Sequence, residues 1–316
     1  MKILFTSAGR RVELIELFRS AAKRLNLDVL LYGADMDVSA PSLAFCDGKL
    51  EVPRIKSEKY LPVLKSFCEE NHIDLLIPTI DTDLLLLAQN REMFEAVNTR
   101  VLISAPDKIA LCRDKRYTAD YFHSVGLQSP SPVDDVTKYE GGFPAFIKPK
   151  DGSASKNAYR ADNAEELAHY AEQIPDYIIQ PFVSGTEYTV DIFCDFEGNP
   201  IYITPRIRLA VRAGEVLKTE IRQDETIISE MKQMLADYRP CGPLTVQLIQ
   251  DTATGINWYI EINPRFGGGA PLSMKAGADS AEALLRLMTK ENVSYCANAA
   301  EDGAVFCRFD QSIRVN

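Results

Sequence analysis

The segment that decides the fold is Tyr259-Ile260-Glu261-Ile262-Asn263-Pro264-Arg265, which has the pattern of a strand with one polar face. Side chains along a strand point alternately to its two faces. Glu261, Asn263 and Arg265 are therefore expected on one face. Ile260 and Ile262 are expected on the other face, in the core. Three glycines follow at 267–269, and glycines let backbone N–H groups approach an anion closely.

A second strand is expected over residues 244–250, and the turn-rich residues 251–255 would join the two strands as a hairpin. If Gln247 lies opposite Glu261, its amide oxygen meets the carboxylate beside Asn263. Mg²⁺ prefers such oxygen ligands and completes its shell with waters and phosphate oxygens. We therefore predict Gln247, Glu261 and Asn263 as ligands of Mg²⁺, with Mn²⁺ as an alternative. For Glu261 taken alone, a solvated strand face would be the better interpretation.

A second polar cluster begins at a strand that ends in Lys148 and continues into the small, polar residues 151–157. A loop of this kind after a cationic strand end can fold over phosphates. It is not a Walker loop, because the pattern G-x-x-x-x-G-K-[ST] is absent. Taken alone, Lys148 would be an ordinary surface lysine and the loop an ordinary turn.

The first 110 residues alternate short β-rich runs with amphipathic stretches, which is the pattern of parallel strands joined by helices. Apolar residues at three-to-four spacing predict helices over 12–25 and 60–71. The predicted strands are Ile3 to Thr6, Val29 to Ala34, Leu75 to Pro78 and Val101 to Ser104. An open α/β sheet follows from this pattern.

A dinucleotide site in this half is an alternative, because Gly9 follows the first strand and Asp35 ends the second. A pyrophosphate loop needs several glycines for close backbone approach, and this loop has only Gly9. We therefore interpret residues 1–110 as a Rossmann-like scaffold without a nucleotide of its own.

The second half has a different, α+β pattern. A helix is expected over 117–125, and residues 133–183 are β-rich around one helix at 164–173. Residues 187–265 are interpreted as long strands with turns, and a closing amphipathic helix is expected over 281–289.

Bulk properties exclude several classes of function. The formal charge of -10 and the pI near 5.0 argue against binding nucleic acid or an anionic membrane. The seven cysteines form no C-x-x-C pair, and three histidines offer no zinc ligand set. Neither a signal peptide nor a membrane span is expected. These features predict a cytoplasmic protein; a homo-oligomer remains open.

Taken together, the clusters resemble the ATP-grasp superfamily, and most closely one ATP-grasp unit of the carbamoyl-phosphate synthase large subunit. The resemblance runs from the N-terminus to about Gly277. It implies an α/β then α+β fold: a Rossmann-like pre-ATP-grasp domain over 1–110 and a two-lobed ATP-grasp domain over 111–316. The small lobe would span about 118–183 and the core lobe about 187–290.

The resemblance also implies a binding site for ATP and Mg²⁺. Lys115, Lys148 and the loop containing Ser153 and Ser155 would contact phosphates. Gln180 precedes an adenine-binding hinge at Phe182 and Val183, and Glu187 would bind the ribose. Arg212 takes the cationic position near the γ-phosphate, and Arg265 would steady an acyl phosphate. The residues implied as catalytic are Arg265, Arg212 and Lys148.

The function expected from these features is an ATP-dependent carboxylate–amine ligase acting through an acyl phosphate on small-molecule carboxylate and amine substrates. One alternative is a carbamoyl-phosphate-synthase-like subunit that phosphorylates bicarbonate or carbamate. An alternative of another class is a non-catalytic ATP-binding regulatory module. Six strand-end residues are candidates for acceptor contact, although cap and turn roles fit them equally: Ser7, Gly9, Arg10, Thr79, Asp81 and Asp83.

Overall fold

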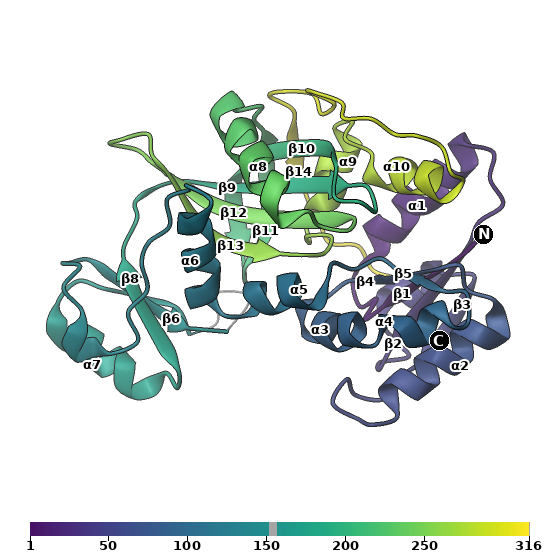
Figure 1. Ribbon diagram of the computed structural model, residues 1–316, viewed down its shortest axis with the longest axis horizontal. Coiled ribbons are helices and arrows are strands. Elements are labelled where there is room, and N and C mark those ends of the chain that lie inside the picture. Colours follow the sequence, from purple (N-terminus) through teal and green to yellow (C-terminus); the bar gives the residue numbers. More distant parts are fainter. Residues whose placement is uncertain (152–156, 316) are drawn as a thin grey trace.

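The computed structural model describes residues 1–151 and 157–315, and within them three β-sheets organise the chain (Figure 1). In Figure 1 the N-terminal sheet lies at the lower right, the smallest sheet at the lower left and the largest sheet above them. The mixed fold of an α/β unit followed by an α+β unit, predicted from the sequence, is confirmed.

The N-terminal sheet is parallel, with five strands in the order β3-β2-β1-β4-β5. Its strands are β1 (Lys2–Thr6), β2 (Leu30–Asp35), β3 (Gly48–Glu51), β4 (Leu75–Pro78) and β5 (Arg100–Val101). Strand β3 was not predicted, because four mostly polar residues carry no clear alternation. The strand expected over 101–104 is paired only at its first residue.

Helices flank this sheet and continue into the second half. They are α1 (Val12–Arg24), η1 (Pro41–Phe45), α2 (Tyr60–Asn71), α3 (Asp81–Gln89), α4 (Arg91–Glu95) and α5 (Pro106–Arg113). The predictions for α1 and α2 are confirmed. Helix α3 was missed because its run of four leucines has no amphipathic period.

The smallest sheet has the order β7-β6-β8 and packs against one helix. Its elements are η2 (Val136–Lys138), β6 (Ala145–Pro149), β7 (Tyr159–Ala161), α7 (Ala164–Gln173) and β8 (Tyr177–Pro181). Helix α7 has the predicted bounds, and Asn163 caps it by accepting a hydrogen bond from the Glu166 amide. Helix α6 (Lys115–Ser124) leads into this lobe.

The largest sheet is antiparallel, with six strands in the order β13-β12-β9-β10-β11-β14. Its elements are β9 (Gly185–Cys194), β10 (Pro200–Arg212), β11 (Glu215–Ile221), α8 (Glu225–Tyr238), β12 (Pro243–Asp251), β13 (Asn257–Asn263), α9 (Ala270–Lys275), α10 (Ser280–Met288) and β14 (Val305–Cys307). Helix α8 corrects the interpretation of 187–265 as strands and turns alone.

A bulge breaks the alternation predicted for β13. Gln247 pairs with Glu261 and Leu248 with Tyr259, so Ile260 is the extra residue. Tyr259 therefore joins Ile262 in the core, while Ile260 is only partly buried. The expectation that Ile260 faces the core with Ile262 is wrong for this reason. The hairpin itself, with Gln247 opposite Glu261, is confirmed.

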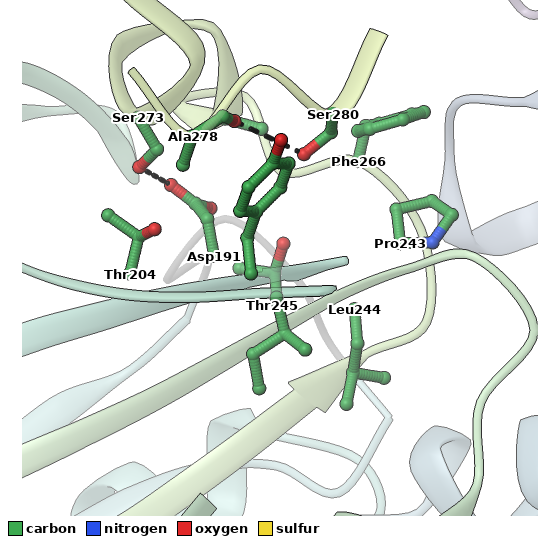
Figure 2. A pocket seen from close by; sticks show the side chains of 12 residues that line it. Asp191, Thr204, Pro243, Leu244, Thr245, Phe266, Ser273, Ala278 and Ser280 are labelled. Atoms are coloured by element: carbon green, nitrogen blue, oxygen red, sulfur yellow. Dashed lines mark hydrogen bonds between the residues drawn. The ribbon is translucent and has the colours of Figure 1, made fainter. Parts of the chain in front are cut away.

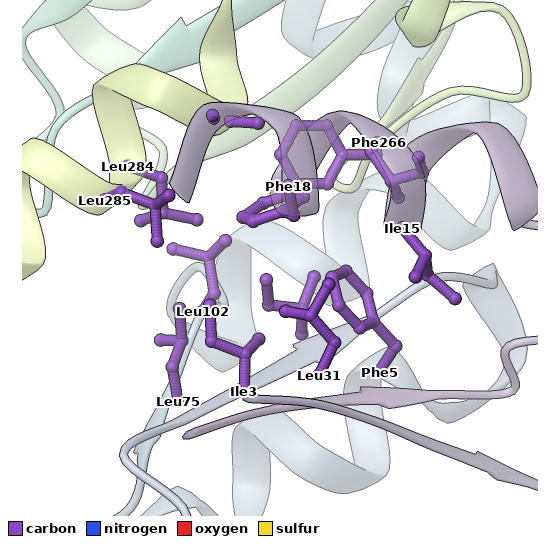
Figure 3. Packing of buried hydrophobic residues seen from close by; sticks show 14 of the residues in the cluster. Ile3, Phe5, Ile15, Phe18, Leu31, Leu75, Leu102, Phe266, Leu284 and Leu285 are labelled. Carbon is purple, nitrogen blue, oxygen red and sulfur yellow. The ribbon is translucent and has the colours of Figure 1, made fainter. Parts of the chain in front are cut away.

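One hydrophobic core crosses from the N-terminal sheet to the C-terminal helices (Figure 3). Phe18 of α1 packs edge-on against Phe5 below it and Phe266 above it, with ring centroids 5.2 and 6.1 Å apart. Leu284 and Leu285 of α10 belong to the same cluster. Such shared burial fixes the N-terminal domain against the largest sheet, and the candidate site lies at this junction.

No helix of the described residues is long and apolar enough to cross a membrane. The seven cysteines are all free thiols.

Candidate active site

A cavity of about 260 Å³ opens between the carboxyl end of the N-terminal sheet and the polar face of the largest sheet. Four strands contribute one residue each to a single row across its floor. Glu261 pairs with Gln247, Gln247 with Thr189, and Thr189 with Arg206. All four line the cavity. The core residues alternate with them, so the hydrophobic pattern of each strand aims these polar side chains at the cavity.

The three predicted metal ligands, Gln247, Glu261 and Asn263, all line this cavity. Among the described residues no three His, Cys, Asp or Glu side chains converge on a metal position. The set is instead one carboxylate and two amides, chemically suited to Mg²⁺ only if phosphate oxygens and water complete the shell. The Gln247 Oε1 atom accepts a hydrogen bond from Arg208 Nη1 at 3.0 Å, which leaves its second lone pair for a metal.

Arg265 reaches from the end of this sheet to the N-terminal domain. Its Nη2 donates to Asp81 Oδ2 at 2.6 Å, and Asp81 begins α3 directly after the β4 edge. Its Nε is buried and has no hydrogen-bond partner among the described residues. A buried donor without an acceptor is costly, so Arg265 has capacity left for an anion in the cavity.

The arginine expected in the cavity at position 212 is replaced by Arg208. Arg212 does not line the cavity; it is exposed and pairs with Asp310 at 3.2 Å. Two register shifts in β10, between 208 and 210 and between 210 and 211, break the alternation that would carry 206 and 208 on to 212. Arg208 does line the cavity, is 10% exposed, and lies 3.5 Å from Glu187.

Lys148 is buried near the end of β6, which contradicts the surface-lysine alternative. Burial lowers its pKa to about 8, and the Lys115 charge adds to that shift while Glu261 opposes it. Lys115 and Glu261 also line a neighbouring cavity of about 80 Å³. Lys148, Lys115 and Glu261 thus lie close together. A bound polyanion there would reduce the repulsion between the two lysines.

The predicted hinge residues follow the end of β8. Gln180 is buried and donates through Nε2 to the Pro130 carbonyl. The Phe182 amide donates to Pro144 O at 3.1 Å, and Val183 is half-buried. Glu187 is exposed beside Arg208. Ser153 and Ser155 lie outside the described residues.

The strand-end candidates divide into structural and cavity-facing residues. Asp83 is buried and accepts hydrogen bonds from Thr6, Ser7 and Tyr60, and its pKa is raised to about 6 mainly by burial. Thr79 is also buried and donates to Thr6 O and Ser7 O. Both are therefore structural.

The cavity side of the N-terminal domain consists of Asp81 and of Arg11, which the sequence did not single out; Arg10 is exposed instead. The Gly9 amide donates to Asp35 Oδ2 at 2.8 Å, so the Asp35 carboxylate already occupies that donor. The signal that could have found Arg11 is its place as the N-cap residue of α1, in the loop that follows β1.

Two family models match the chain. Residues 3–102 match the PylC-like N-terminal domain, and residues 173–306 match the family described as ATP-grasp in the biosynthetic pathway with Ter operon. The second match contains Gln247, Glu261 and Asn263. Residues 173–306 therefore form an ATP-grasp domain.

Two relatives of known name match parts of the chain, and their names describe different reactions. The chain is 22% identical over 149 residues to a carbamoyl-phosphate synthase of Methanobrevibacter smithii, covering 45% of this chain and 40% of the relative. It is 31% identical over 86 residues to a D-alanine–D-alanine ligase of Fusobacterium nucleatum, covering 26% of this chain and 29% of that ligase. The chain thus spans less than half the length of either relative.

Solved structures show the same ATP-grasp fold at low sequence identity. The biotin carboxylase domain of Hydrogenobacter thermophilus 2-oxoglutarate carboxylase, solved with Mg-ADP and bicarbonate, superposes with a TM-score of 0.77 at 16% identity. The match covers 96% of this chain and 73% of that chain. At this identity the likeness establishes the fold of the ATP-grasp unit and leaves the substrate to be argued from the cavity.

Proposed function

We propose that the chain is a magnesium-dependent, ADP-forming carboxylate–amine ligase. The observation that carries the proposal is the single cavity in which Gln247, Glu261 and Asn263 face Arg11 and Asp81 of the N-terminal domain. One wall offers oxygen ligands for a metal–phosphate complex. The opposite wall offers charged groups for a small acceptor, at the sheet edge where open α/β sheets bind ligands.

The nucleotide is proposed to lie between the small sheet and the largest sheet. Lys115 and Lys148 offset phosphate charge, and Ser153 and Ser155, which lie outside the described residues, stay proposed phosphate contacts. Glu187 binds the ribose. The adenine lies against the hinge at Phe182 and Val183, next to Gln180. Arg208, rather than Arg212, supplies the cation near the γ-phosphate, because Arg208 is the one that lines the cavity.

Bound at Gln247, Glu261 and Asn263, Mg²⁺ would neutralise phosphate charge and polarise the phosphoryl oxygens. A set with one carboxylate is weak without nucleotide, so the metal is expected to enter with ATP. The named cofactors are therefore ATP and Mg²⁺, with Mn²⁺ as the alternative ion.

The reaction needs positioned charges and no enzyme nucleophile. A carboxylate oxygen of the acceptor attacks the γ-phosphorus, the bond to the β,γ-bridging oxygen breaks, and ADP leaves. The amine nitrogen then attacks the acyl carbon, loses a proton, and displaces phosphate as the carbon–oxygen bond breaks. Arg265, whose Nε has no partner, donates to the charge that develops on the acyl phosphate.

The two relatives support different functions. The D-alanine–D-alanine ligase named above joins a carboxylate to an amine, as proposed for this chain. The carbamoyl-phosphate synthase relative favours the alternative, phosphorylation of bicarbonate or carbamate. We place the protein in the cytoplasm, supported by its free thiols and by the cytosolic supply of ATP.

The first test measures ADP release with Mg-ATP against a panel of amino acids and dicarboxylates, with and without added amines, and identifies products by mass. We expect turnover that requires a carboxylate, with an amide as product. Glu261→Gln is the matched control: it keeps the side-chain shape and should lower turnover on the order of 100-fold, because the only carboxylate of the metal set is lost.

Two outcomes would contradict the ligase function. Turnover that responds to bicarbonate and ammonia alone, yielding carbamoyl phosphate, would favour the synthase-like alternative. Tight binding of Mg-ATP with no ADP release under any condition would favour a regulatory ATP-binding module.

A further inference from the structure

We propose that Arg11 and Arg206 together bind a second anionic group of the acceptor, so that the substrate is an acid with two anionic groups. The inference rests on the proposed ligase function, since the first carboxylate is the one that receives the phosphoryl group. The second group, a carboxylate or a phosphate, is recognised at the end of the cavity away from the metal ligands.

Among the described residues that line the cavity, one arginine has no carboxylate in an ion pair with it. Three arginines each have a carboxylate: Arg265 pairs with Asp81, Arg206 with Asp191 and Arg208 with Glu187. Glu215, which also lines the cavity, pairs with Arg308. Glu261 is the acid left for the metal.

Arg11 forms no ion pair with any of the described residues. Its guanidinium donates through Nη2 to the Thr79 carbonyl at 2.6 Å. Burial lowers its pKa to about 10, with Arg265 and Arg308 adding to the shift and Asp81 and Glu215 opposing it. Arg11 thus stays charged at neutral pH. A partly buried cation in this position gains most from an anionic ligand.

Arg206 has an unused donor in the same place. Its Nε donates to Asp191 Oδ2 at 2.8 Å, whereas its Nη1 is buried without a partner. Asp191 is held from the other side by Ser273 Oγ at 2.6 Å (Figure 2). The pocket drawn there holds only about 10 Å³, room for about one water, so it serves the ion pair and no ligand. Arg206 is therefore fixed, and its buried Nη1 has no acceptor among the described residues.

Each of the two arginines lies close to one residue of the glycine segment, residues 267–269. A Cβ on Gly269 would lie 2.5 Å from Arg206 Nη2, and a Cβ on Gly268 would lie 3.6 Å from Arg11 Nη1. Both guanidinium groups therefore approach adjacent residues of one short segment. Both arginines and both glycines line the same cavity, so in the proposed complex one anionic group beside Gly268 meets both guanidinium groups.

This position is separate from the metal position. In the row across the cavity floor, Arg206 stands three strands away from Glu261, a backbone separation of roughly 14 Å at the usual strand spacing. The long side chains of Arg206 and Glu261 shorten this separation, but one carboxylate cannot contact both the arginine and a metal at Glu261. The cavity of about 260 Å³ must also receive the γ-phosphate, so the acceptor is a small acid.

The test uses pairs of acids that differ only in the second anionic group: glutamate and glutamine, aspartate and asparagine, O-phosphoserine and serine. Binding is measured by calorimetry on the full chain with Mg²⁺ and a non-hydrolysable ATP analogue, so the result does not depend on turnover. We expect the charged member of at least one pair to bind roughly 10- to 100-fold more tightly, as for hydrogen bonds to charged groups. The preferred pair tells carboxylate from phosphate.

Variants then locate the effect. Arg11→Met should abolish the difference within the preferred pair and leave the affinity for the ATP analogue unchanged, and Arg11→Lys should restore part of it. Arg206→Lys should reduce the difference as well. Arg19→Met, at an exposed residue on α1 that pairs with Asp47, is the control and should change nothing.

Three outcomes overturn the inference: no member of any pair binds, both members of each pair bind equally, or Arg11→Met preserves the difference. Failure of the ligase function has another signature. In that case the charged acids bind as expected, yet none of them stimulates ADP release from Mg-ATP.

Discussion

Lys148 is a buried cation beside the proposed phosphate site. The side chain is buried, and its pKa is lowered to about 8 by burial and by Lys115. The folded-state pKa is below the ordinary lysine value, so the ammonium destabilises the ligand-free protein at neutral pH. This penalty is present below about pH 8 and fades as the pH rises toward the unfolded value. A bound polyphosphate reverses it.

We predict that Lys148→Met shifts stability in opposite directions with and without nucleotide. Without ATP, the variant should be more stable than the parent at pH 7, by roughly 1–3 kcal/mol, and this gain should shrink by pH 10. With Mg²⁺ and an ATP analogue, the variant should show a smaller increase in Tm than the parent, because a charge that faces phosphate is gone.

Thermal melting at both pH values, with and without the analogue, checks this prediction. Lys138→Met, at an exposed lysine paired with Asp135, is the control. Equal Tm values and equal nucleotide shifts for Lys148→Met and the parent would leave Lys148 with no phosphate role.

At the scale of elements, the glycine segment that begins at Gly267 joins β13 to α9 under tight packing. Gly269→Ala would place a methyl group 2.5 Å from Arg206 Nη2 and 2.8 Å from Val216 Cγ1. We predict a loss of roughly 1–3 kcal/mol of stability from this overpacking. Displacing Arg206 should also weaken binding of the acid that supports turnover.

Gly268→Ala is the matched comparison for stability, because its nearest contact is an ordinary 3.6 Å. Denaturant unfolding of both variants measures the difference. If Gly269→Ala unfolds at the same denaturant concentration as Gly268→Ala, the close packing of Arg206 against this segment is not present in solution.

Helices and strands with a clear hydrophobic period were predictable from the sequence. Features that depend on how strands pair were not. Helix α7 and the β12–β13 hairpin follow from local pattern. The bulges that move Ile260 out of the core and Arg212 out of the cavity depend on the neighbouring strands, which local alternation cannot reveal. Helix α8 did carry a helical signal, since its buried residues recur at three-to-four spacing, but the strand interpretation of 187–265 overrode it.

At the scale of the whole molecule, the site exists because distant segments share one core. Phe266 packs between Phe18 of the N-terminal domain and Phe193 of the largest sheet, and this contact directly precedes the glycine segment. The sequence predicted the polar strand that carries Glu261. It could not show that Arg11, some 250 positions earlier, would face the same cavity, because that contact is made by tertiary packing alone.

The central claim is that a carboxylate oxygen of the acceptor attacks ATP. The most direct measurement uses the acid that best stimulates ADP release, labelled with ¹⁸O in its carboxylate, together with its amine partner and Mg-ATP. Mass analysis of the released phosphate should show one ¹⁸O for each amide formed, because the acyl phosphate leaves with a former carboxylate oxygen. Phosphate without ¹⁸O, formed in step with ADP and the amide, would contradict the account.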